Sequence, residues 1–66
     1  MTKKELTSKL LERRNYLQFR LNIRTQEKEM AFKYQDSEDY KKAQRDCERL
    51  FARISEIDMF LNMLKD

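Results

Sequence analysis

The sequence of 66 residues predicts an all-α fold, an antiparallel hairpin of two long helices. It contains neither glycine nor proline, the residues that mark tight turns between strands. Its apolar residues recur at helical spacing. Charged residues make up 41% of the chain, a fraction that suits amphipathic helices because their outer faces remain in water.

The first helix is expected to span about residues 3–33. Thr2 and Glu5 have the spacing of a capping box, in which each side chain satisfies a backbone N–H at the start of a helix. At about 100° per residue, one face of this helix then carries an apolar stripe. Its members are Leu6, Leu10, Leu17 and Leu21, with Ala31 and Phe32 close by.

A second apolar stripe lies on another face of the same helix. It consists of Tyr16, Phe19, Ile23, Met30 and Tyr34. One neighbouring helix cannot cover both stripes, so we expect a second chain to cover this one. Phe60 and Met63, in the apolar run near the C-terminus, are expected to join this second interface, although that run also suits a groove for a partner helix.

A turn is expected near residues 34–37, where strong helix formers are scarce. Asp36 or Ser37 can cap a second helix, and Glu38 and Asp39 then lie in its first turn, where the helix dipole favours acids. The alternative is one unbroken helix. We favour the hairpin because the apolar heptad of the second half, extended backwards, places charged and amide side chains at its inner positions.

The second helix, about residues 37–65, carries a coiled-coil seam. Its inner heptad positions are uncharged throughout and comprise Tyr40, Ala43, Cys47, Leu50, Ile54, Ile57, Leu61 and Leu64. In a hairpin around this turn, the numbers of facing residues add up to about 70. The predicted core therefore joins the seam to Leu10, Leu17 and Leu21.

So short a chain buries only about 60% of its unfolded surface, which makes a monomeric core marginal. We therefore expect a homodimer, most simply a four-helix bundle of two hairpins. Without histidine or glycine, and with Cys47 alone on the seam, the sequence offers no catalytic, cofactor or metal site. The absence of a long apolar run predicts a cytoplasmic protein without a membrane span.

A basic strip on the first helix has three interpretations. It consists of Lys9, Arg13, Arg20 and Arg24, and the half of the chain that contains it, residues 1–34, holds nine Lys and Arg against four Glu. The strip can pair with acids of the second helix. The expected partners are Asp46 for Arg24, Glu56 for Arg14 and Asp58 for Arg13.

In the other two interpretations the strip binds nucleic acid or an acidic protein. A nucleic acid would place its phosphates on the arginines, while Tyr16 and Phe19 stack on unpaired bases. The leading expectation is a non-enzymatic interaction module or small regulator that acts as a homodimer. The alternative is an RNA- or DNA-binding hairpin.

Two resemblances accompany this interpretation. The segment Glu38-Asp39-Tyr40-Lys41-Lys42-Ala43 resembles the opening of helical-hairpin repeats such as tetratricopeptide units, which supports a helix start there. In length, hairpin form and a polar, basic first helix, the chain resembles the small plasmid RNA-binding hairpin that dimerises into a four-helix bundle. Because no motif is shared, the second resemblance concerns architecture and assigns no function.

Overall fold

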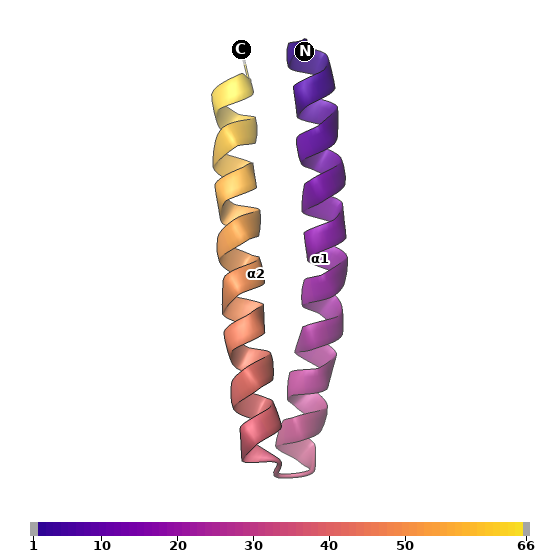
Figure 1. Cartoon of the computed structure of the whole chain (residues 1–66), viewed down its shortest axis with the longest axis vertical. Helices are drawn as coiled ribbons and strands as arrows, with labels where there is room; N and C mark the ends of the chain where they lie inside the picture. The colour runs from indigo at the N-terminus through magenta and orange to yellow at the C-terminus, as the bar shows by residue number, and fades with distance from the viewer. Residues whose placement is uncertain (1, 66) are drawn as a thin grey trace.

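The structure, a computed structural model, describes residues 2–65 and consists of two helices packed against each other (Figure 1). Helix α1 spans Lys3–Lys33 and α2 spans Ser37–Leu64. They run antiparallel, so both ends of the chain lie at the same end of a rod that measures 48 × 15 × 15 Å. The predicted all-α hairpin is confirmed, including the position of its turn.

Side-chain caps define both helix starts. The hydroxyl of Thr2 accepts a hydrogen bond from the backbone N–H of Glu5 at 3.1 Å, which is one half of the expected capping box. The carboxylate of Asp36 accepts one from the backbone N–H of Asp39, also at 3.1 Å. Each cap satisfies a backbone donor that the first turn of a helix leaves without a partner.

The turn ends α1 in a Schellman motif. The backbone N–H of Asp36 donates to the carbonyl of Ala31 at 2.8 Å, and that of Gln35 donates to the carbonyl of Phe32 at 3.2 Å. Gln35 has a φ of 57°, the left-handed conformation that this motif requires. Glycine usually occupies this position because a Cβ is disfavoured there. The chain therefore makes its turn with an unfavourable residue.

Replacing Gln35 with glycine is expected to stabilise the hairpin. Removing the Cβ removes the steric cost of the left-handed conformation, whereas glycine makes the unfolded chain more flexible and so opposes this gain. The net effect is expected to be a rise of about 0.5–1 kcal/mol in the free energy of unfolding. Urea denaturation followed by circular dichroism measures this change. Gln44→Gly, at an exposed position inside α2, is the matched control and should lose about 1 kcal/mol. A loss in both variants would contradict the role given to Gln35.

The core is a narrow seam between the helices. Its buried members are Leu17 from α1 and Leu50, Ile54 and Ile57 from α2, with Leu10, Leu21 and Leu61 partly buried against them. Two alanines, Ala31 and Ala43, are buried nearer the turn. Tyr40, Cys47 and Leu64 are half-buried. The seam is therefore closed in the middle and at the two alanines, and more open at the end away from the turn.

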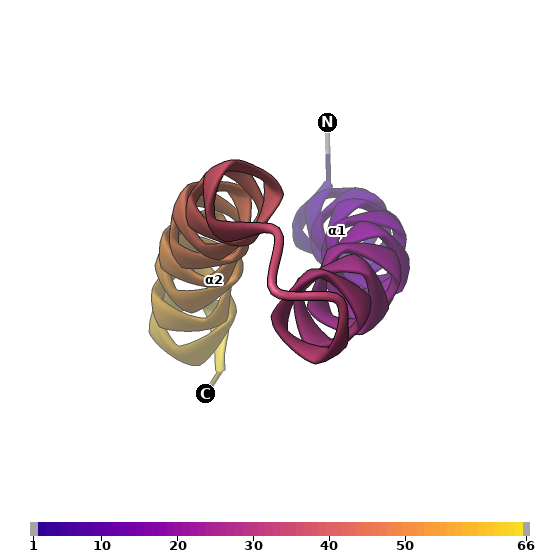
Figure 2. The same ribbon diagram turned by 90° about the horizontal axis from the view of Figure 1, so that it is seen from below.

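Two members of the expected α1 core face, Leu6 and Phe32, are exposed and do not join the core. Phe32 is 74% exposed, and its ring rests against that of Tyr40 with 6.0 Å between the centroids. Ala31, the neighbouring position, is buried instead. The end-on view in Figure 2 shows that the two helices are inclined to each other, so that the face α1 turns towards α2 changes along its length. The predicted core face assumed a straight helix with about 100° per residue, which does not include this inclination.

Candidate functional site

The largest exposed apolar feature of α1 is the second stripe, and it lies on the outside of the helix. At about 100° per residue, its middle is about 150° away from the direction of Leu17 and Leu21, which pack on α2. All five side chains of the stripe are exposed. They are Tyr16, Phe19, Ile23, Met30 and Tyr34. Within one chain, no helix covers this face over the described residues.

Phe60 and Met63 do not lie next to the stripe within one chain. Both are exposed on α2, Met63 on the side opposite the seam and Phe60 beside it. The stripe, by contrast, is on the outer side of α1. The residues expected to form one second interface are thus on two different faces of the hairpin.

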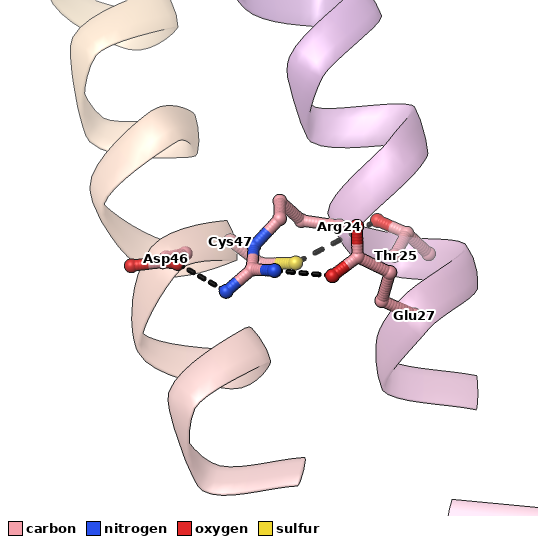
Figure 3. A network of polar contacts seen from close by, with 5 residues as sticks. All are labelled: Arg24, Thr25, Glu27, Asp46 and Cys47. Atoms are coloured by element: carbon pink, nitrogen blue, oxygen red, sulfur yellow. Dashed lines mark hydrogen bonds and ion pairs between the residues drawn. The ribbon is translucent and has the colours of Figure 1, made fainter. Parts of the chain in front are cut away.

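Arg24 connects the two helices. Its guanidinium donates through Nη2 to Asp46 on α2 and through Nη1 to Glu27 on its own helix (Figure 3). The hydrogen bond to Asp46 contributes most to raising the pKa of Arg24 above its ordinary value, and burial opposes the rise. The expected pair of Arg24 and Asp46 is present, so this member of the basic strip is engaged within the chain.

The second interhelical ion pair differs from the expectation. Arg14 donates to Asp58 in a two-pronged contact, with Nε–Oδ1 at 2.6 Å and Nη2–Oδ2 at 3.4 Å. The hydrogen bond to Asp58, aided by its charge, raises the pKa of Arg14. The expected pairings of Arg14 with Glu56 and of Arg13 with Asp58 are therefore wrong. Arg14 and Asp58 lie on one side of the seam, whereas Arg13 and Glu56 lie on the other side, with Arg24 and Asp46.

Arg13 and Arg20 lie beside an aromatic ring and not beside acids. Their guanidinium carbons are 5.5 Å and 6.0 Å from the centre of the Tyr16 ring, within the range of cation–π contacts. Lys9 is exposed on the same side of α1. The basic strip therefore divides into three exposed cations and Arg24, which holds the helices together.

Two further arginines, on α2, share the side of the hairpin that Arg24 and Asp46 mark. Arg20 and Lys42 also point to this side, but Arg20 borders the apolar stripe and Lys42 lies near the turn with Asp36 and Asp39. Of the other cations, Arg13 and Lys9 lie within about 60° of Arg24 around α1, and Arg49 and Arg53 lie within about 60° of Asp46 around α2. All four are exposed. We call Lys9, Arg13, Arg49 and Arg53 the basic side. The strip predicted on α1 alone left out Arg49 and Arg53, although their spacing of four residues in the sequence places them on one face of a helix.

The opposite side of the seam is largely uncharged apart from the Arg14–Asp58 pair. Gln18 donates to Asn22 at 3.1 Å on the surface of α1. Thr25 and Cys47 approach across the helices, with 3.8 Å between Oγ1 and Sγ, a weak hydrogen bond (Figure 3). Cys47 is a half-buried free thiol. Its surroundings are those of a packing residue.

The described residues contain no cluster of three or more potential metal-ligating His, Cys, Asp or Glu side chains. Neither α1 nor α2 has an apolar segment long enough to cross a membrane. The chain matches no model of a known protein family, and no curated protein or solved structure is significantly similar to it. The surfaces described above are therefore the basis for any functional proposal.

Proposed function

We propose that this chain is a non-enzymatic protein-interaction module that acts as a homodimer through the outer apolar stripe of α1. The observation that carries the proposal is that an entire apolar face of a long helix is exposed in the single chain. Large contiguous apolar surfaces on small domains mark sites of association.

The small core supports association. Apart from the two alanines near the turn, four side chains form the buried cluster of the seam. A two-helix chain of this length gains little from such a core against the conformational entropy that folding removes. Covering the stripe would extend the apolar core to the other side of α1.

The direction of the stripe determines how two hairpins would meet. In a square four-helix bundle each helix has neighbours about 90° apart, whereas the stripe is about 150° from the seam. Two copies joined through their stripes would therefore form a row, with the α1 helices at the centre and the α2 helices outside. This is a four-helix assembly of a flatter kind than a square bundle.

Charge complementarity favours a second copy that runs antiparallel to the first. Arg20 and Glu27 lie on the same edge of the stripe. When two stripes are centred on each other in antiparallel orientation, Phe19 faces Met30 of the second copy, and Arg20 comes next to Glu27 of that copy, twice by symmetry. Glu27 uses Oε2 for Arg24, while its Oε1 accepts no hydrogen bond within residues 2–65.

Light scattering on protein eluting from a sizing column tests the proposal. Each chain has a mass of 8.2 kDa, and we expect the unmodified protein to elute at twice that mass. Phe19→Glu places a charge in the middle of the stripe, where burial without a partner is unfavourable. We expect this variant to elute at the mass of one chain.

The matched control is Phe51→Glu on α2. Phe51 is 64% exposed and Phe19 62%, so both substitutions replace an equally accessible phenylalanine in a helix. Only Phe19 belongs to the stripe, and Phe51→Glu should remain dimeric. A monomeric unmodified protein, or equal dissociation of both variants, would contradict the proposal.

A further inference from the structure

We infer that the basic side, Lys9, Arg13, Arg49 and Arg53, binds the phosphate backbone of double-stranded nucleic acid. The inference does not depend on the homodimer, because the proposed dimer contact uses none of these four residues. It rests on their even spacing across two helices, on their lack of acidic partners and on the position of the nearby aromatic rings.

The two ion pairs between the helices fix the heights of the four cations along the rod. Since Arg24 meets Asp46 and Arg14 meets Asp58, facing residues have numbers that add up to about 70–72. Arg53 is then level with about residue 18 of α1 and Arg49 with about residue 22. The four cations therefore follow one another at steps of about 6–8 Å, over a total of about 20 Å.

This row has the dimensions of a duplex contact. One strand carries a phosphate about every 3.4 Å along the axis, so 20 Å corresponds to roughly six base pairs. Three of the four cations are arginines, whose planar guanidinium groups bind phosphate oxygens in pairs. The row passes from α1 to α2, so it requires the hairpin and not only a basic helix.

All four cations are available to a ligand. They are exposed, and none of them forms an ion pair or hydrogen bond with another residue in the 2–65 range. Glu27 and Asp46, the two acids next to Arg24, are both bonded to it. Two acids lie at the edges of the row, Glu12 three residues after Lys9 and Glu56 three residues after Arg53, and the four cations outnumber them.

The aromatic residues favour a duplex over a single strand. Proteins that bind single strands stack bases on free aromatic faces. The ring of Tyr16 already has the guanidinium groups of Arg13 and Arg20 next to it. Phe19 lies about 100° or more around α1 from Arg13 and Arg20, so it cannot stack a base on the same strand that these arginines hold. Contact with the phosphate groups of a duplex requires neither the Tyr16 ring nor the Phe19 ring.

Fluorescence anisotropy with a labelled DNA duplex of about 24 base pairs tests the inference over a series of salt concentrations. Four phosphate contacts predict a slope of about −3.6 in log affinity against log salt, which weakens binding about 100-fold between 50 and 200 mM salt. In Arg49→Gln/Arg53→Gln the slope should fall to about −1.8, and the same salt change should weaken binding only about 10-fold.

The matched control is Lys4→Gln/Lys41→Gln, which removes the same charge from exposed positions that lie away from the basic side. It should keep the full slope. An equal reduction in both double variants would show general charge attraction and overturn the assignment to this side. Tighter binding of a single strand of the same length would overturn the duplex, and absence of binding at low salt would overturn the inference altogether.

One further variant separates nucleic acid from an acidic protein partner. Phe60 is exposed and level with Lys9 and Arg13, on the same side, and a protein partner would use it as an apolar anchor. Phe60→Ser should leave duplex affinity unchanged. The opposite result would be that the protein binds polyglutamate and not the duplex, and that Phe60→Ser no longer binds polyglutamate. That result would assign the surface to an acidic protein instead. In light scattering, Arg49→Gln/Arg53→Gln should have the same mass as the unmodified protein. A change in its duplex binding then cannot be a consequence of a lost dimer.

Discussion

Leu17→Ala is expected to lower the free energy of unfolding by about 2–5 kcal/mol, the range for truncating a fully buried leucine. Leu17 is only 2% exposed and is the α1 member of the buried cluster with Leu50, Ile54 and Ile57. The α2 side chains pack around this one leucine, so its truncation leaves a cavity that straight helices cannot close. Urea denaturation, followed by circular dichroism at one fixed protein concentration, measures the loss.

Leu11→Ala is the control for this prediction. Leu11 is on the same helix but is 45% exposed and contributes nothing to the buried cluster. Its truncation should change the free energy of unfolding by about 0.5 kcal/mol or less. If the two variants lost equal stability, the seam as described would not be the core of the molecule.

The fold was predictable because its strongest signal is local. The uncharged inner heptad positions of α2 extend from Tyr40 to Leu64, and charged residues interrupt the same heptad before the turn. The position of Asp36 as a cap follows from its chemistry. The conformation of Gln35 did not follow, because nothing in glutamine itself favours a positive φ, and the requirement comes from the hydrogen bonds of the turn.

The candidate surfaces were predictable only in part. The apolar stripe of α1 follows from helical spacing alone, because exposure on the outer face needs no knowledge of the register. Ion pairs depend on the register and on the side of the seam, and Arg14 bonds to Asp58 because Glu56 lies on the other side. The basic side needs both the register and the direction of each helix, so a strip defined on α1 alone included Arg24 and left out Arg53.

Ala43→Leu is expected to lower the free energy of unfolding by about 1–3 kcal/mol, the usual effect of overfilling a packed site. Ala43 is buried on the face that α2 turns towards α1, and Ala31 is buried near it on α1. The short side chains let the helices approach each other near the turn. A leucine there must either separate the helices or adopt an unfavourable rotamer, since the three-residue connection between α1 and α2 holds their ends together.

Ala52→Leu is the matched control, because Ala52 lies on the same helix but is exposed on its outer side. Leucine and alanine have similar helix propensities, so this variant should change the free energy of unfolding by about 0.5 kcal/mol or less. Equal stability of Ala43→Leu and Ala52→Leu would show that the helices do not approach closely at Ala43. A selective loss in Ala43→Leu would instead mean that the two alanines set the distance between the helices near the turn.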